Sequence, residues 1–316
     1  MEPSTKMNTQ ARPSPVPAPA PANHSANHSA AASHSVYWNA VRKLFREKRL
    51  GAAGAVIAVL FLFIGIFASA LAPYGMNEVN MGARLQPPSW AHPFGTDNLG
   101  RDLLSRCIYG AQISVIIGLV VATIATTISA LVGIVSGYFG GKVDLLIQRF
   151  VDAWMSFPGL VVLIVVASVF GAGIPQIVIT LGLLIGIGGS RIVRSAVVSV
   201  REHMYIHAAK SIGASSFRVL WRHVLPNVIP PLIVLFTSSV GTAILAESGL
   251  SFLGLGVPPP HPTWGGMLSG NGRTYMLQGP WLALAPGLCL SLVVYATNVF
   301  GDALRDILDP RMRGSR

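Results

Sequence analysis

The chain has 316 residues, of which 52% are hydrophobic and only 11% are charged, and its net charge is +11. Soluble globular domains carry about 25% charged residues, so this composition excludes an ordinary soluble fold and indicates a membrane protein. A positive charge of this size would suggest a nucleic-acid partner in a soluble protein. Here it indicates basic loops held on one side of a membrane, and we expect no nucleic-acid partner.

The N-terminal segment, residues 1–35, is rich in Pro, Ala, Ser, Asn and His and contains the near-repeat NHSANHSA. A segment of this composition has too little apolar surface to fold, so we predict a disordered tail. Residues 36–50 follow, and they include the run VRKLFREKR. They are predicted to form a basic amphipathic segment beside the membrane.

Six apolar runs come next, and we predict that each crosses the membrane, whose hydrocarbon core is about 30 Å thick. They predict an all-α membrane protein with a six-helix domain at 51–304 and a short C-terminal tail at 305–316. The glycines of the fourth run, Gly182, Gly186 and Gly189 among them, indicate close helix packing. The six predicted spans are 51–72, 111–137, 145–171, 175–190, 228–253 and 281–300.

The distribution of basic residues predicts the orientation. Six spans place both termini on the same side of the membrane. With the N-terminus inside, the outer segments hold only Arg84, Arg101, Arg106 and Arg273, and the other basic residues beside the spans lie in the inner segments. Because basic residues concentrate on the cytoplasmic side, we expect cytoplasmic N- and C-termini.

The stretch 205–226, YIHAAKSIGASSFRVLWRHVLP, is a polar and basic segment between two apolar runs. Such a segment cannot lie in hydrocarbon and must protrude into water, here on the cytoplasmic side. Tyr205, Ala208, Ala209 and Ile212 are spaced to form one apolar stripe of a helix. Gly213 suits a left-handed C-cap that ends this helix.

A second helix is predicted after the glycine. Ser215 or Ser216 can cap its N-terminus, and Pro226 is expected to stop it. Two interpretations remain open: a compact knob presented to a partner protein, or a helical hairpin lying on the bilayer surface. The apolar stripe of the second helix consists of Phe217, Leu220, Trp221 and Val224.

The layout of Ala208-Ala209, Gly213 and Leu225-Pro226 resembles the Glu-Ala-Ala loop of bacterial ABC importer permeases, with His207 where that family usually has glutamate. Three further blocks resemble the C-type permease subunits of the dipeptide and oligopeptide importer family, which also handles nickel and glutathione. These blocks are FGTDNLGRDLLSRCIYG (94–110), LAESGLSFLGLGVPPPHPTWG (245–265) and GDALRDILDPRMR (301–313).

The resemblance implies the type I ABC importer permease fold and a subunit that imports short peptides across a bacterial inner membrane, with nickel or glutathione as alternative cargo. It implies four kinds of partner: a second homologous permease, two ATP-binding subunits that hold ATP and Mg²⁺, an extracytoplasmic substrate-binding protein, and the lipid bilayer. We call residues 200–226 the coupling segment, because the resemblance implies that this loop fits a groove of an ATPase. Its expected contact residues are Tyr205, His207, Ala208, Ala209, Gly213, Phe217, Leu225 and Pro226.

Two further groups are candidate site residues. Glu247 is a carboxylate near the outer end of the fifth span, where a charged group predicts a function; it is expected either to line the translocation pathway or to reach into water. Asp97, Asn98, Arg101 and Asp102 form the polar core of the first outer loop. They predict either docking of an external binding protein or a structural Asx-turn and helix start.

The sequence predicts no enzyme activity and no cofactor or metal on this chain. The phosphate-binding pattern Gly-x-x-x-x-Gly-Lys-Ser/Thr is absent, because Lys142 is followed by Val143. ATP hydrolysis is therefore expected on separate subunits. An intramembrane enzyme would need a motif such as HExxH, which the sequence lacks. A stand-alone ion-coupled transporter would show buried charges on several spans and an internal repeat, and neither is evident.

Several other residues are interpreted as structural. Cys107 and Cys289 lie far apart in the sequence, beside or within apolar runs, and are predicted to be ordinary packing residues. Asp144, Arg149 and Asp152, at the start of the third span, are spaced for local pairing along one helix.

Overall fold

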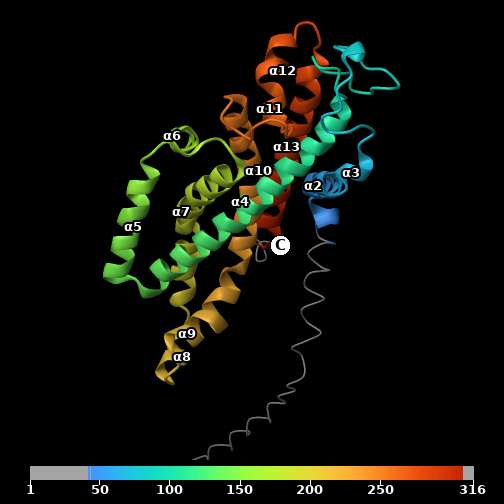
Figure 1. The fold of residues 1–316 in the computed structure, drawn as a ribbon. Coiled ribbons are helices and arrows are strands. Elements are labelled where there is room, and N and C mark those ends of the chain that lie inside the picture. Colours follow the sequence, from blue (N-terminus) through green and yellow to red (C-terminus); the bar gives the residue numbers. More distant parts are fainter. Residues whose placement is uncertain (1–41, 43, 309–316) are drawn as a thin grey trace, which may run out of the picture. The chain divides into compact units, whose positions relative to one another are not determined.

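The computed structural model describes Arg42 and residues 44–308. The predicted disordered segment 1–35 lies outside the described residues, as do 36–41, 43 and 309–316. The elements of the described part are helices, which confirms the predicted all-α class (Figure 1).

Five described helices are long and apolar enough to cross a membrane, and a bent helix pair makes a sixth if it counts as one span. One of the six predicted spans, 145–171, is therefore present only in a broken form. The five helices are α2 (Arg49–Ile66), α4 (Leu103–Phe139), α7 (Ile174–Arg201), α13 (Trp281–Leu308) and the helix Ser216–Phe252, which ends with α10 (Leu225–Phe252).

The bent pair replaces the continuous span predicted at 145–171. It consists of α5 (Gly141–Met155) and α6 (Gly159–Phe170), which are bent by 75°. Pro158 stands at the N-cap of α6. Proline lacks a backbone N–H and disfavours the helical conformation of the residue before it, so the helix breaks here although the apolar run continues.

The shorter helices connect these long ones. The first predicted span ends early, since α2 stops at Ile66 and a separate turn of helix follows Phe67. The shorter elements are α3 (Ala68–Leu71), η1 (Met81–Ala83), α8 (Met204–Ser211), α9 (Ser216–Val219), the π-helical turn η2 (Leu220–Val224), α11 (Trp264–Leu268) and α12 (Gly270–Tyr275).

Helix α4 extends well beyond the predicted span 111–137 at its N-terminal end. Asp102 caps that end, where its Oδ2 accepts a 2.7 Å hydrogen bond from the backbone N of Ser105. At the other end, Gly140 follows the last helical residue with φ 65°. Positive φ is cheap only for glycine, so Gly140 ends the helix and turns the chain into α5.

Helix α7 packs along α4 through small residues, as the glycines of the fourth predicted span indicated. A Cβ added at Gly186 would lie 2.9 Å from Ala125 O, and one added at Gly133 would lie 2.6 Å from Ser190 O. The Ser129 hydroxyl donates a 2.7 Å hydrogen bond to Gly186 O across this contact. The helix continues to Arg201, past the predicted end at residue 190.

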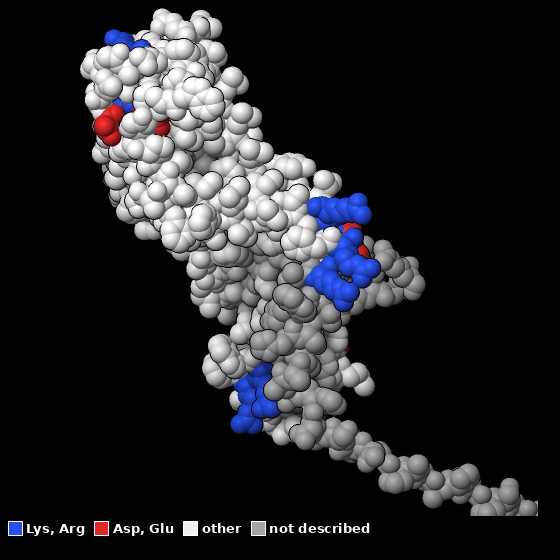
Figure 2. Space-filling model, turned by 90° about the vertical axis from the view of Figure 1, so that its right-hand side faces the viewer, with Lys and Arg blue, Asp and Glu red and all other residues white. Residues whose placement is uncertain are grey.

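The ribbon places α8 and α9 at one end of the described part and α11 and α12 at the opposite end (Figure 1). On the face in Figure 2, a broad band without Lys, Arg, Asp or Glu separates the charged groups at the upper end from those lower down. Large apolar side chains such as Val169 and Phe170 are exposed on α6. An uncharged apolar surface of this kind suits contact with lipid or with other membrane helices.

Candidate functional site

The coupling segment folds around the corner that the sequence predicted. Gly213 has φ +83°, and its backbone N donates to Lys210 O at 3.0 Å. Ala214 N donates to Ala209 O, also at 3.0 Å, so the last carbonyls of α8 are paired. Ser215 caps α9, where its hydroxyl accepts from Arg218 N at 3.4 Å. The left-handed C-cap and the serine cap are both confirmed.

The two predicted apolar stripes are divided between the protein interior and the surface. In α8, Ile206 is fully buried, whereas Tyr205 and Ala208 are exposed and Ala209 is half-buried. The predicted stripe of α8 is therefore mostly exposed, and Ile206, which lies outside it, packs the helix against the rest of the molecule. The outward face of the segment carries large apolar side chains: Met204 (86% exposed), Ile212 (86%), Phe217 (76%) and Trp221 (67%).

The second helix of the coupling segment does not stop at Pro226. Residues Ser216–Phe252 form one continuous helix of 37 residues, with Pro226 inside the first turn of α10. The π-helical turn before it, where Leu225 N bonds to Leu220 O, is wider than an α-helical turn and makes room for the proline ring. The exposed knob is consequently continuous with a long membrane helix.

A buried cluster fixes the coupling segment to α4 and α7. Val219 and Val224 are fully buried in the same cluster as Val193 and Val197 of α7. The Lys210 ammonium lies 4.9 Å from the ring centre of Tyr138, near the end of α4.

Arg201, the last residue of α7, also joins this helix to the end of α4 by hydrogen bonds. Its Nη1 donates to the backbone oxygens of Gly137 (3.1 Å) and Tyr138 (3.4 Å). These carbonyls end α4, where a cation is favourable for the helix dipole.

Ion pairs also link α5 to α7. Asp144 accepts two hydrogen bonds from Arg194, at 2.6 Å from Nε and 2.5 Å from Nη2, and it also pairs with the Ser136 hydroxyl. Asp152 pairs with Arg191. Local pairing was expected here, but within α5 only Arg149 and Asp152 approach one another, at 3.9 Å. The shorter contacts run between helices.

His207 occupies the position where the resembling family has glutamate. It lies on the exposed side of α8, and its side chain makes no hydrogen bond or ion pair with any residue that the structure describes. The imidazole is therefore available to a partner as a donor or as an acceptor.

The first outer loop forms the Asx-turn and helix start that were one of its two predicted roles. Asp97 Oδ1 accepts from Leu99 N (2.8 Å) and Arg101 N (3.0 Å), and its Oδ2 accepts from Arg101 Nε (2.6 Å). Asp102, the α4 cap, also contacts His92 Nδ1 at 2.9 Å. Asp97 and Asp102 are buried, so only Asn98 and Arg101 of the four keep a partly open surface. Docking of a binding protein at this loop stays a prediction.

Glu247 lies inside the protein and not at a cavity or in water. Its residue is 0% exposed, and its Oε1 accepts a 2.6 Å hydrogen bond from the Ser251 hydroxyl. The Ser248 hydroxyl lies 3.3 Å from Oε2. The expected exposure of this carboxylate is therefore wrong for this conformation of the chain. A role of Glu247 in translocation stays a prediction.

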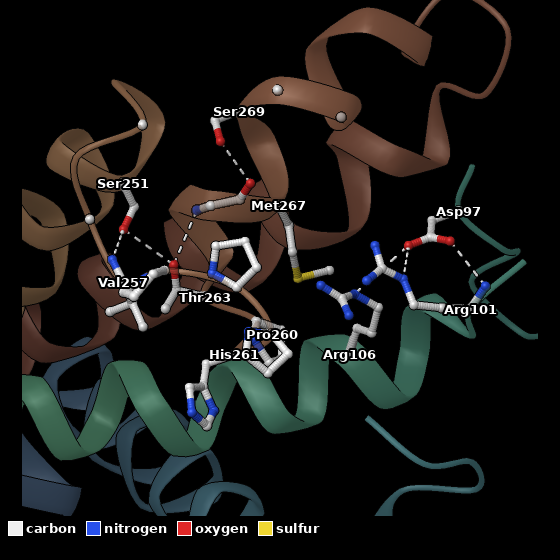
Figure 3. Close-up of a pocket in the computed structure, with 18 of the residues that line it drawn as sticks. Asp97, Arg101, Arg106, Ser251, Val257, Pro260, His261, Thr263, Met267 and Ser269 are labelled. Atoms are coloured by element: carbon white, nitrogen blue, oxygen red, sulfur yellow. Dashed lines mark hydrogen bonds and ion pairs between the residues drawn. The ribbon is translucent and has the colours of Figure 1, made fainter. Parts of the chain in front are cut away.

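A cavity of about 410 Å³ lies at the α11–α12 end (Figure 3). Its walls come from the loop before α4, the segment 254–263 and the α11–α12 region. Asp97 is its one acidic lining residue among those described, and Arg101 and Arg106 are its two cations. Sequence reasoning had singled out Asp97, Asn98 and Arg101, but it assigned no site role to the proline-rich wall or to Arg106, because a contact between segments distant in the sequence leaves no local signal.

The structure also brings together two residues that the sequence left apart. Cys107 on α4 and Cys289 on α13 are free cysteines that pack in the same part of the structure. They belong to one apolar cluster with Leu103 and Leu282. The sequence predicted that both cysteines are packing residues. It did not predict that they share one cluster, because residues so far apart in the sequence show no common pattern.

Two family models match the chain. Residues 129–314 match "Binding-protein-dependent transport system inner membrane component", and residues 37–88 match "N-terminal TM domain of oligopeptide transport permease C". The first match includes the coupling segment, α10 and α13. Together the two cover the first described helix and more than half of the chain.

Similar proteins in several bacteria carry transport names. The chain is 39% identical over 277 residues to the dipeptide transport system permease protein DppC of Alkalihalophilus pseudofirmus, covering 87% of this chain and 90% of that protein. It is 40% identical over 273 residues to the probable D,D-dipeptide transport system permease protein DdpC of Escherichia coli (86% and 91%). It is 38% identical over 278 residues to the glutathione transport system permease protein GsiD of Shigella sonnei (88% and 91%).

These matches agree with the all-helical architecture and with a coupling segment joined to a membrane helix. Sequence identity near 40% over most of both chains means that this chain and these relatives share one fold. The chain belongs to the inner membrane components of binding-protein-dependent transport systems, and it is a membrane permease subunit of an ABC transporter.

Proposed function

We propose that this permease subunit imports short peptides and that its coupling segment transmits the movement of an ATPase to the membrane helices. The observation that carries the proposal is the continuous helix Ser216–Phe252, which begins in the exposed knob and runs through the membrane domain. A rigid helix passes a displacement at one end to the other end, which a flexible linker would absorb.

The outward face of the knob supports a protein partner over a purely lipid-facing surface. Phe217 and Trp221 are stacked in parallel, with ring centres 6.5 Å apart, and both are exposed. Aromatic side chains in such positions are enriched where binding energy concentrates in protein interfaces. Arg218 and Arg222, on the same helix, favour a partner with an acidic rim.

The partners follow from the family. We propose a second homologous permease, two ATP-binding subunits that hold ATP and Mg²⁺, and an extracytoplasmic substrate-binding protein. This chain itself holds no cofactor and performs no catalysis. Both termini and the coupling segment lie in the cytoplasm, and the α11–α12 end faces the binding protein.

Removal of the aromatic pair tests the interaction with the ATPase. The variant Phe217→Ala/Trp221→Ala is expected to insert normally but to co-purify with much less ATP-binding subunit, because it loses the apolar anchor of the knob. Leu277→Ala is the matched control, since Leu277 is 90% exposed at the opposite end. Unchanged recovery of ATP-binding subunits with the double variant would contradict the proposal.

The names of the relatives support peptides as cargo, and the similarity to GsiD makes glutathione a second candidate. Uptake in a deletion strain complemented with this chain distinguishes the two. We expect uptake of a labelled dipeptide that excess unlabelled dipeptide suppresses and excess glutathione does not. The reverse pattern of competition would assign glutathione.

A further inference from the structure

The cavity at the α11–α12 end has an excess of positive charge that the fold itself does not neutralise. Asp97 is the only carboxylate of its described lining, and its oxygens already accept from Leu99 N, Arg101 N and Arg101 Nε. Figure 3 shows the guanidinium groups of Arg101 and Arg106 next to one another, between Asp97 and Met267. Two cations beside one carboxylate leave a net positive charge, which attracts a further anion.

Both arginines are held in place and remain able to donate. Arg106 Nη1 donates to Met76 O (3.1 Å) and Asn77 Oδ1 (3.2 Å), and its Nε lies 3.9 Å from Asp97 Oδ2. Arg101 uses Nε on Asp97, and among the described residues its two Nη atoms make no hydrogen bond. A guanidinium with free Nη donors and a fixed orientation is suited to bind a carboxylate.

Another part of the cavity lining is largely apolar. It consists of Val257 and the proline run 258–260, followed by His261 and Pro262. Prolines offer no N–H donor, so this wall favours an apolar body over a second charged group. A volume of about 410 Å³ is within the range of small-ligand sites, which combine apolar walls with a few fixed polar groups.

We propose that this cavity binds the terminal carboxylate of a short peptide, with Arg101 and Arg106 on the carboxylate and the proline wall against the peptide side chains. The inference rests on the proposed function, because it gives the imported peptide a contact on the permease itself. It assigns recognition of the free carboxylate to this subunit at the point where cargo arrives from the binding protein.

The first experiment compares two probes on the purified permease–ATPase complex without its binding protein. Alanyl-alanine is expected to bind saturably, and alanyl-alanine amide is expected to bind about tenfold more weakly or worse, because charge-assisted hydrogen bonds to the carboxylate are lost. This comparison needs no variant and therefore cannot be confused with misfolding. Equal affinity for the two probes, or no saturable binding of the acid, overturns the proposal.

Variants then locate the contact. Arg101→Gln is expected to weaken binding of the acid about tenfold and to abolish the preference over the amide, whereas Arg101→Lys, which keeps the charge but loses the fixed pair of donors, should retain only part of that preference. Arg84→Gln is the matched control, since Arg84 is an exposed arginine at the same end that does not line the cavity. An undiminished preference in Arg101→Gln, or an equal loss in Arg84→Gln, contradicts the assignment.

Two outcomes separate this inference from the proposed function. If the full transporter takes up dipeptides while its complex without the binding protein treats acid and amide alike, the inference fails and the proposed function stands. If Arg101→Gln weakens only the association of the binding protein, the cavity is a docking site for that protein, which also overturns the inference. Absence of any peptide uptake refutes the proposed function itself.

Discussion

Gly213 shows how one residue sets the geometry of the coupling segment. Its φ of +83° lies in the left-handed region, and a Cβ added there would meet nothing within 4 Å in this chain. The requirement for glycine therefore comes from the backbone and from whatever a partner places at the corner, and not from packing inside the subunit. Asparagine tolerates this conformation, whereas a β-branched residue does not.

We therefore predict that Gly213→Val and Gly213→Asn behave differently. Valine destabilises the left-handed corner by about 1–2 kcal/mol, which should shift α8 against α9 and reduce peptide uptake strongly at normal membrane insertion. Asparagine should retain most uptake. Uptake and ATPase rate in proteoliposomes measure the effect. If both variants lose activity equally, glycine is required at this position because the partner leaves no space for a side chain, and not because of the backbone conformation.

Residues with a local signal were predictable, and those with long-range contacts were not. The roles of Gly213 as a helix C-cap and of Ser215 as a helix N-cap were predicted from the residues next to them in the sequence, and both predictions are confirmed. Ile206 is buried in a cluster with residues of α4 and α7, which are distant in the sequence, and Glu247 is fully buried as well. No periodic pattern within one helix reports which side a neighbouring helix will cover, so these two positions were misjudged or missed.

At the scale of elements, hydropathy located the spans but not their ends or their breaks. Pro158 breaks an apolar run, whereas Pro226 does not break the helix that contains it. The difference lies in the position: Pro158 precedes a new helix at a sharp bend, whereas Pro226 follows a π-helical turn that makes room for the ring. Hydrophobicity alone carries no information on either point.

The pairing of α5 with α7 leads to a prediction at this scale. Asp144 and Arg194 are partly buried, with exposed side-chain fractions of 18% and 35%, and their contact is bidentate. A double-mutant cycle with Asp144→Asn and Arg194→Gln should give a coupling of about 1 kcal/mol in unfolding of the purified subunit.

The control pair for this cycle is Arg149 with Asp152, which is 3.9 Å apart and mostly exposed. Its coupling should not exceed about 0.5 kcal/mol, as is usual for exposed pairs on one helix. Equal couplings for the two pairs would mean that the link between α5 and α7 does not hold the bent pair in place.

The continuous helix Ser216–Phe252 leads to a second prediction. Insertion of Gly-Gly between Val224 and Leu225 should interrupt the helix between the knob and α10, because glycine is a poor helix former. We expect ATP-binding subunits to co-purify as before while uptake falls to near background. The same insertion after Trp90, which is fully exposed in a loop at the other end, should leave uptake largely intact. Normal uptake with the first insertion would show that rigidity at this junction is not required.

At the scale of the whole molecule, the two ends differ in charge and in structure. The α8–α9 end carries basic residues such as Lys142 and Lys210 and an exposed apolar knob. The α11–α12 end carries the turn around the buried carboxylate of Asp97 and the arginine-lined cavity. An uncharged band lies between them on the face in Figure 2. This asymmetry is what the positive-inside rule expects of a subunit with its knob in the cytoplasm.

Single-cysteine labelling tests that orientation on the whole subunit. With Cys107→Ser and Cys289→Ser as background, Leu277→Cys should react with a membrane-impermeant maleimide in spheroplasts, since Leu277 is 90% exposed at the α11–α12 end, which we expect to face outward. Lys142→Cys, at the exposed corner between α4 and α5, should react only in inside-out vesicles. Both should react after solubilisation, which controls for access. Labelling of Lys142→Cys in spheroplasts would place the knob outside the cell, where no ATP is available to an ATPase, and the coupling mechanism would then be impossible.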